Sequence, residues 1–441
     1  MSSDLFKFFE KREINQVAYE NGFIQRCSKM KAWMFIDSLL FSKFNYKELC
    51  LNDIAVDFSM KYNLNISKQG IDERFNASSV KMVKSLLFKM IEHYSAMHKL
   101  DSVFSNFKSI RIKDSTSFQL PENMSKYFPG NGGNSSEAVA RIQYEFDLKN
   151  GKILEMDLQP VTNNDYSNAW NTRDSIGTGD LIIRDLGYSS LKMLKEIDIR
   201  KAYYLNRVKP DVAIFEKIGN KYITLNLKPI EAMLRKEGVP AIEKHVFIGD
   251  RKFIPVRLII MTVPEDKIQE RINRQKRKSK RRSSKNNPRC LETLGLNLFV
   301  TNTQTSILPL GQVYELYKLR WQIELIFKAW KSIGQVHLLK KAKPERILTL
   351  LYLKLLWVLM NMNVINALTA VIFNSTKMKL SVLKAFKIFQ CYIEQIRQCI
   401  HNKIKLEELL GQMLITIKAK ALTEKRKCKI FSLDIILSFA V

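Results

Sequence analysis

The residues best suited to chemistry lie in the stretch YKLRWQIELIFKAWK. On an α-helix that turns ~100° per residue, Arg320, Glu324 and Lys331 fall within about 40° of one another, beside an apolar arc. Such a helix can bury one face and hold a carboxylate among cations in a cleft. The alternative is a surface helix on which Arg320 and Glu324 form an i,i+4 ion pair worth about 0.2–0.5 kcal/mol. The polar row consists of Tyr317, Arg320, Glu324, Lys328 and Lys331.

Four of these residues have a specific spacing. Tyr317, Arg320, Glu324 and Lys331 form the YREK signature. In this feature the sequence resembles the insertion-sequence family 4 transposases, bacterial DDE enzymes that excise and reinsert DNA. The resemblance implies that Glu324 is the catalytic glutamate and that Tyr317, Arg320 and Lys331 contact DNA phosphates near the cleavage point. We extend this role to Lys328, because three cations for one glutamate exceed what an ion pair requires.

Two aspartates are candidates to join Glu324. Alternation in SIRIKDSTSF predicts a strand that ends before Asp114, and GDLIIRDLGY predicts a buried strand followed by Asp185. Two aspartates at adjacent strand ends and a glutamate from a helix suit a pair of divalent cations. KDST and RDLGY resemble the family's first and second catalytic aspartates, which implies two Mg²⁺ ions, with Mn²⁺ as the alternative. Asp165 is the hardest to exclude of the competing acids, which are Asp147, Asp157, Asp165 and Asp180.

The charge of the chain indicates its partner. Seventy-two Lys and Arg residues against 43 Asp and Glu give a net charge of +29 over 441 residues. Spread through a chain with 46% hydrophobic residues, this charge favours a globular protein that binds double-stranded DNA. For a transposase, that DNA would be the terminal inverted repeats of the element and the target.

Other features bear on location and cofactors. The six cysteines show no CxxC spacing, which argues against zinc. The N-terminus MSSDLFKFFEKREINQ has no apolar signal-peptide core, so we expect a cytoplasmic, nucleoid-associated bacterial protein. The apolar stretch 347–373 contains Lys354 and three asparagines, which favours a helix buried in protein over a membrane span.

Periodicity and the resemblance together predict a mixed α/β fold. We expect an RNase H-like core interrupted by a β-strand-rich insertion, with helical regions at both ends. The expected units are a DNA-binding region at 1–108, core segments at 109–208 and 296–343, the insertion at 209–295, and a helical C-terminal region at 344–441.

The N-terminal region contains a helix-turn-helix pattern within 46–75. Ser67 is a good N-cap for a short second helix that carries Lys68, Gln69 and Arg74, which are candidates to read base edges. An ordinary α-hairpin is equally compatible with the pattern. The resemblance favours recognition of the element ends.

The insertion contains the basic run KRKSKRRSSK. A charge run is commonly a solvated face, but in a DNA enzyme we expect phosphate contacts, which carry no sequence information. The residues concerned are Lys276, Arg277, Lys278, Lys280, Arg281 and Arg282. Family members that form a DNA hairpin often hold a flipped base with a tryptophan from this insertion. Residues 209–295 contain none, and Phe299 is the candidate substitute.

The C-terminal region has no metal or nucleotide motif, so packing is its expected role. A homodimer is expected in the synaptic complex, because two ends of one element must be brought together. Two other functions remain open: a DNA-binding protein that has lost catalysis, and an RNase H-like nuclease. The presence of all three acids argues against the first, and a nuclease has no need of the YREK helix.

Overall fold

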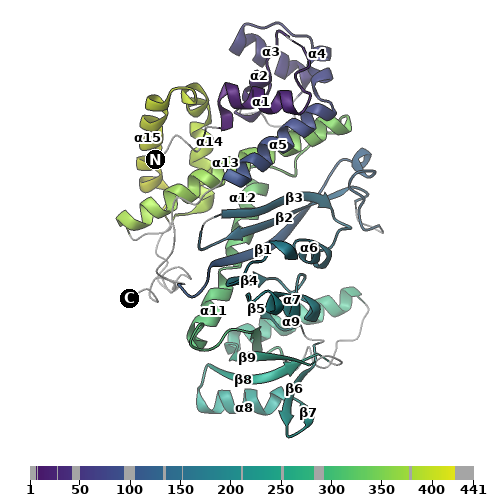
Figure 1. The fold of residues 1–441 in the computed structure, drawn as a ribbon, viewed down its shortest axis with the longest axis vertical. Helices are drawn as coiled ribbons and strands as arrows, with labels where there is room; N and C mark the ends of the chain where they lie inside the picture. Colours follow the sequence, from purple (N-terminus) through teal and green to yellow (C-terminus); the bar gives the residue numbers. More distant parts are fainter. Residues whose placement is uncertain are drawn as a thin grey trace.

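One long sheet runs through the centre of the molecule (Figure 1). Helices of the N- and C-terminal regions gather at one end of the sheet, and the inserted segment lies at the other (Figure 1). This architecture is that of a computed structural model, which describes residues 6, 8–26, 28–41, 50–93, 105–132, 136–150, 152–209, 212–249, 253–282, 293–376 and 380–422.

The described segments contain ten strands, all in this sheet, in the order β3-β2-β1-β4-β5-β10-β9-β8-β6-β7. The pairings of β4 with β1 and with β5 are parallel, and all the other pairings are antiparallel. The mixed α/β fold is therefore as predicted. The strands are β1 (Ser109–Gln119), β2 (Val139–Asp147), β3 (Lys152–Pro160), β4 (Asp180–Arg184), β5 (Tyr203–Arg207), β6 (Ile214–Ile218), β7 (Lys221–Thr224), β8 (Ala241–Ile248), β9 (Ile254–Thr262) and β10 (Leu296–Thr301).

Strand β1 is longer than the sequence pattern suggested. Its antiparallel partner β2 pairs with it as far as Gln119, whereas its parallel partner β4 stops at the register pair Lys113 and Arg184. Asp114 therefore lies inside β1, and the prediction that the strand ends before Asp114 is wrong. What ends at Asp114 is the pairing with β4, because β2 continues to supply hydrogen-bond partners and β4 does not.

The inserted segment extends the core sheet. Strand β10 pairs with β5 on one side and β9 on the other, so β9, β8, β6 and β7 continue the same sheet. The segment also contains two helices, α8 (Leu227–Glu237) and α9 (Glu265–Arg282). Most of the basic run is thus helical; its last residues, 283–285, lie outside the described part of the chain.

The N-terminal region is helical and contains the predicted helix-turn-helix. Helix α3 (Leu51–Tyr62) ends at Asn63, which has φ 51°, and the Ser67 hydroxyl caps α4 (Lys68–Arg74) by accepting a hydrogen bond from the Gly70 amide. The start of the predicted stretch, 46–49, falls outside the described residues. The other helices here are α1 (Lys11–Glu20), α2 (Ala32–Leu40) and α5 (Ala77–His93).

The YREK segment is two helices rather than the single helix that was expected. Helix α11 (Leu310–Lys318) ends just before Leu319, and α12 (Trp321–Ser332) begins after Arg320. At the junction the amides of Leu319, Arg320 and Ile323 bond to carbonyls three residues back, so the turn is tighter than an α-helix. Tyr317 is therefore on a different helix from Glu324.

The C-terminal region packs around the apolar helix α13 (Pro344–Thr376). Its span Pro344–Ile365 is long and apolar enough to cross a membrane, but 89% of that window is buried within the protein. Lys354, inside this span, is 2% exposed and donates hydrogen bonds to the carbonyls of Gln335 and Leu338. The helix α13 is thus a core helix, as predicted. It is followed by α14 (Val382–Cys399) and α15 (Lys403–Lys420).

A row of buried charges crosses the sheet one position before the two aspartates. Lys113 lies opposite Glu145 on β2 and Arg184 on β4, and Glu145 lies opposite Glu155 on β3. Glu145 accepts from Arg111 Nε at 3.0 Å and Arg184 Nη2 at 3.3 Å. Burial alone would raise the pKa of Glu145, but Arg111, Lys113 and Arg184 hold it well below its usual range. Removing this carboxylate would leave three buried cations poorly compensated.

We therefore predict that Glu145→Gln destabilises the core by about 3–5 kcal/mol, the cost of breaking a buried ion pair. Chemical unfolding followed by near-UV circular dichroism measures it. Glu155→Gln is the matched control: its carboxylate is more exposed and pairs with Lys113 alone among these cations, so its loss should cost less. Equal and small losses for both variants would show that the row does not stabilise the sheet.

Candidate active site

Asp114 and Asp185 are brought together by the register of two parallel strands. Each follows directly after a member of the register pair Lys113 and Arg184. Adjacent strands lie about 4.8 Å apart, and paired positions on parallel strands point to the same face. Asp114 therefore points away from the buried charge row, toward the face that α12 covers. The Asp185 carbonyl accepts a hydrogen bond from the Tyr188 amide, which closes the turn that follows β4.

Arg320 joins this pair to the glutamate. Its Nη1 donates to Asp114 Oδ2 at 2.6 Å, and its Nη2 donates to Glu324 Oε1 at 2.9 Å. A single guanidinium thus spans carboxylates that are 210 positions apart in the chain (324 minus 114). The arginine is 7% exposed, whereas the Glu324 side chain is 51% exposed to solvent. Arg320 thus joins two of the three predicted acids, and the register of β1 and β4 places Asp185 beside Asp114.

The three acids influence one another electrostatically. Burial raises the pKa of Asp114 to about 6, and the charges of Asp185 and Glu324 add to the increase, while the Ser115 amide and Arg320 oppose it. Burial lowers the pKa of Arg320, but Tyr317, Asp114 and Asp185 more than compensate and keep the guanidinium charged. Negative charge is concentrated here, and the arginine neutralises only part of it.

Tyr317 and Phe299 are both buried beside this site. Tyr317 is 6% exposed, and its buried hydroxyl has no hydrogen-bond partner among the described residues. Burial and then Asp185 raise the pKa of Tyr317, against the effect of Arg320. Phe299 is 1% exposed, with its ring 5.0 Å from that of Tyr317. A DNA base cannot stack on Phe299 in this structure, so the base-stacking expectation is not carried further.

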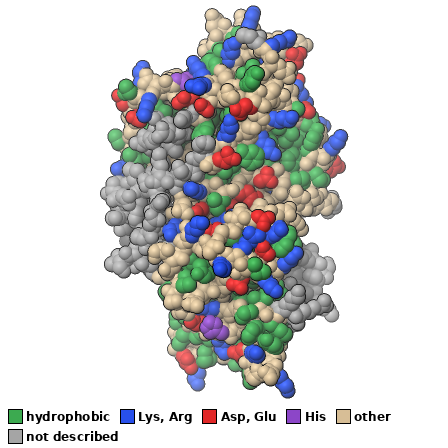
Figure 2. Space-filling model, viewed as in Figure 1, with side chains coloured by type: hydrophobic (Ala, Val, Ile, Leu, Met, Phe, Trp, Pro, Cys, Tyr) green, Lys and Arg blue, Asp and Glu red, His purple; other side chains and the backbone are tan. Residues whose placement is uncertain are grey.

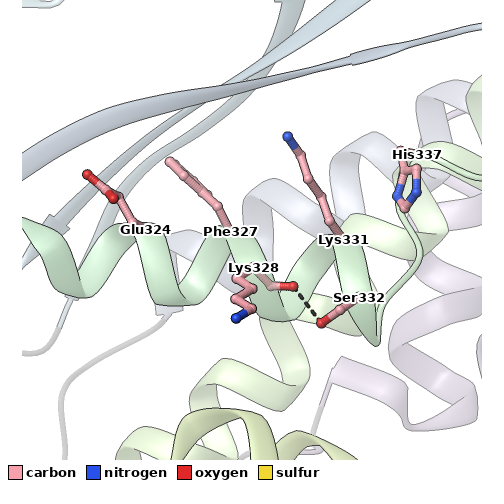
Figure 3. Close-up of a pocket in the computed structure, with 6 residues that line it drawn as sticks. All are labelled: Glu324, Phe327, Lys328, Lys331, Ser332 and His337. Atoms are coloured by element: carbon pink, nitrogen blue, oxygen red, sulfur yellow. Dashed lines mark hydrogen bonds between the residues drawn. The ribbon is translucent and has the colours of Figure 1, made fainter. Parts of the chain in front are cut away.

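A solvent-open groove runs along α12 (Figure 3). Glu324, Phe327 and Lys331 project from one side of the helix, and Lys331 Nζ donates to the Ser117 carbonyl on β1 at 3.0 Å. Lys328 is exposed and points away from them, which corrects the expectation that all three cations face the same way. The groove has a volume of about 520 Å³ and is lined by Glu324, Phe327, Lys328, Lys331, Ser332 and His337.

Three of the four competing acids are occupied by structural contacts. Asp165 accepts from the side chains of Ser115, Arg141 and Gln143. Asp147 caps the turn after β2 by accepting three backbone amides, and Asp180 accepts from Ser109, Arg111 and Gly177. Asp157 lies on β3, where burial raises its pKa. None of these contacts involves Arg320. Asp165 still lies near the site, because its partner Ser115 is the residue after Asp114.

The residues expected to bind DNA away from this site lie on both of the flanking regions. Lys68 and Gln69 are exposed, and Arg74 is partly exposed, on α4. Lys276 and Arg277 are exposed on α9; the side chains of Lys278, Lys280, Arg281 and Arg282 lie outside the description. Lysine and arginine side chains are spread over the visible face from the N-terminal helices to the insertion (Figure 2).

The donor set suits a hard divalent cation, because all three acids offer carboxylate oxygens. Among the described residues, however, no three acids are spaced as a ready-made metal cluster. The guanidinium of Arg320 lies between Asp114 and Glu324 and accounts for this spacing. Metal binding at these acids would therefore require Arg320 to exchange at least one of its partners.

Comparisons with known proteins agree with this arrangement. A family model described as a transposase DDE domain matches residues 105–360, which is more than half of the chain and contains all three acids. The chain belongs to the DDE transposases. The transposase for insertion sequence element IS1151 of Clostridium perfringens is 28% identical over 99% of this chain and 95% of its own length. The transposase for IS231F of Bacillus thuringiensis subsp. israelensis is 31% identical over 79% and 76%.

These relatives confirm the predicted resemblance to bacterial insertion-sequence transposases, and the protein is a DNA transposase. The large mixed sheet with helices at both ends is consistent with the RNase H-like fold of the DDE domain.

Sequence reasoning missed the cations that align the two aspartates of this transposase. Lys113 and Arg184 were not singled out, although a signal was present. The two strands have the same pattern where their pairing stops, Ile-Lys-Asp at 112–114 and Ile-Arg-Asp at 183–185. A cation at the same position on two buried strands indicates that the strands face a common anion, here Glu145.

The raised pKa of Asp114 predicts a pH-dependent cost to stability. A carboxyl whose pKa rises from 3.8 to about 6 on folding supports the fold below pH 4 and loses that contribution as the pH rises through 6. Asp114→Asn cannot ionise, so it should raise the free energy of unfolding by about 2–3 kcal/mol at pH 7 and little at pH 4. Urea unfolding at the two pH values measures this. Equal changes in the free energy of unfolding at pH 7 and at pH 4 would contradict this account.

Proposed function

We propose that Asp114, Asp185 and Glu324 are the catalytic acids of this transposase and hold two divalent cations, Mg²⁺ or alternatively Mn²⁺. The observation that carries the proposal is the Arg320 guanidinium, which bonds Asp114 and Glu324. The β1 and β4 register adds Asp185 beside them. Such ions activate water and stabilise the departing 3′ oxygen in an in-line displacement at a phosphodiester.

The residues of the chain then have separate tasks. Asp114 and Asp185 come from the sheet and Glu324 from α12, so each acid approaches the reacting phosphate from a fixed element. Arg320 gives the scissile phosphate a bidentate partner once the carboxylates are neutralised by bound cations. Lys331 keeps one hydrogen bond to Ser117 and has two further donors available for a neighbouring phosphate.

Recognition and general DNA affinity are assigned to the flanking regions. The helix α4, with Lys68, Gln69 and Arg74, recognises the terminal inverted repeats. The basic part of α9 holds duplex DNA through phosphates, in the element or the target. Two copies of the chain pair the two ends of one element as a homodimer, in the bacterial cytoplasm on the nucleoid. The exposed positions of Lys68, Gln69, Lys276 and Arg277 support these assignments.

The alternatives make different predictions for the same acids. A DNA-binding protein without catalysis has no reason to keep Asp114 and Glu324 on one arginine with Asp185 beside them. A nuclease would cleave without joining ends, so strand transfer separates it from a transposase. The match to relatives named as transposases favours joining.

The central test replaces each acid with its amide. Asp114→Asn, Asp185→Asn and Glu324→Gln should each lower cleavage of a duplex carrying an element end by at least about a thousandfold, because each loses a charged metal ligand. Affinity for the same duplex should change less than about threefold. Asp165→Asn is the matched control and should retain metal-dependent cleavage. If it failed as completely as the other three, the acid assignment would be wrong.

The second test addresses the cations of α12. Arg320→Lys should lower cleavage by roughly a hundredfold without unfolding the protein, because lysine cannot form two parallel bonds to a phosphate. Lys331→Ala should weaken the complex formed before cleavage. Lys328→Ala is a control on the same helix, since its amino group points away from the acids, and it should have a smaller effect. If Arg320→Lys and Lys331→Ala both cleaved at the parental rate, the only role left for α12 would be to position Glu324.

The third test separates recognition from general affinity. Replacing Lys68, Gln69 and Arg74 by alanine should remove the preference for element ends over random duplex, because these side chains face solvent on α4. Replacing Lys276 and Arg277 by glutamine should weaken both duplexes equally and flatten the salt dependence, by a slope of about 2. Binding titrations at several salt concentrations distinguish the two. An unchanged preference in the α4 variant would overturn the recognition assignment.

A further inference from the structure

The groove beside Glu324 continues past Lys331 to His337, a residue that the mechanism above does not use. Along α12 the side chains that enter it follow in the order Glu324, Phe327 and Lys331, and His337 closes its far end (Figure 3). The groove is open to solvent and holds about 520 Å³. It therefore connects the acid site to a second polar group, with Phe327 and Lys331 between them.

The turn that presents His337 is held firmly. Gln335 adopts a left-handed φ of 48°. A Cβ atom at position 334 would lie 2.9 Å from Trp330 O and Val358 Cγ2, so this position requires glycine. The buried ammonium of Lys354 donates to the carbonyls of Gln335 and Leu338, on either side of the histidine. The imidazole thus comes from a fixed turn rather than from a loose loop.

His337 has no protein partner that would explain this arrangement. Its Nδ1 is buried and makes no hydrogen bond to any described residue, while the ring lines the groove. Burial, followed by the charges of Lys354 and Lys331, lowers the pKa of His337, so the ring is neutral near pH 7. Because Nδ1 is buried, the ring can meet a ligand only through Nε2, which donates a hydrogen bond in one of the two neutral tautomers. Lys331, which lines the same groove, favours a ligand that is negatively charged.

We propose that His337 binds a backbone phosphate of the DNA strand that enters the acid site, at a position further from the scissile phosphate than the one held by Lys331. This inference rests on the proposed function. Seven helical residues separate Glu324 from Lys331, a rise of about 10.5 Å, which corresponds to about three steps of 3.4 Å along one DNA strand. His337 lies beyond Lys331, so its phosphate is about four or five nucleotides from the cleavage point.

The experiment tests whether the effect of replacing His337 depends on one particular phosphate of the DNA. Duplexes carrying an element end are made with one neutral methylphosphonate at each of positions one to six from the scissile phosphate, and binding is measured for the parent and for His337→Ala. We expect neutralisation of the phosphate at position four or five to weaken parental binding about tenfold. His337→Ala should weaken binding similarly, and the two changes combined should cost no more than either alone.

Three further measurements make the outcome decisive. His337→Gln, which keeps a neutral donor, should retain part of the coupling, and thermal unfolding of both variants checks that the turn is intact. Ser332→Ala, at the groove rim, is the matched control and should couple to no phosphate. Additive losses at every position would overturn the proposal, as would an altered preference for one base pair without phosphate coupling. If the parent shows no metal-dependent cleavage, the proposed function fails instead.

Discussion

The parallel register of β1 and β4 is the constraint on which the site depends. It places Lys113 opposite Arg184, and the next residue on each strand is an aspartate. A shift of one residue would turn one aspartate to the opposite face of the sheet. Both cations are buried and bond to Glu145, so the register is fixed by charges that cannot be separated cheaply. The acid pair on one face is thus positioned by an ion cluster on the other.

The acid site itself lowers the stability of the folded protein. Three carboxylates converge where burial already raises the pKa of Asp114, and one arginine compensates them only in part. In the proposed function this uncompensated negative charge is what attracts the two cations. Arg320 can in turn bind an anion, since it is nearly buried and its Nε has no hydrogen-bond partner in the part of the chain that the structure describes. Acids that need cations and an arginine that can accept an anion together suit a reaction at a phosphodiester.

Much of this was accessible from the sequence, because the strongest signals were local. The YREK spacing and the Asp185 strand indicated the family and the three acids, and net charge indicated DNA. Contacts that depend on tertiary packing were not accessible. The break between α11 and α12, the burial of Phe299 against α11 and the outward direction of Lys328 depend on how these two helices pack on the sheet. His337 was missed because a lone histidine after a helix has no periodicity to mark it.

The most direct measurement is anomalous diffraction from Mn²⁺ in crystals of the protein bound to a DNA end. The account predicts two peaks about 3.5–4 Å apart, each within about 2.6 Å of oxygens from Asp114, Asp185 or Glu324. It also predicts that Arg320 has left at least one carboxylate for a phosphate. Peaks at other acids, or a bound DNA end with Arg320 still bridging Asp114 and Glu324 and no manganese between them, would contradict it.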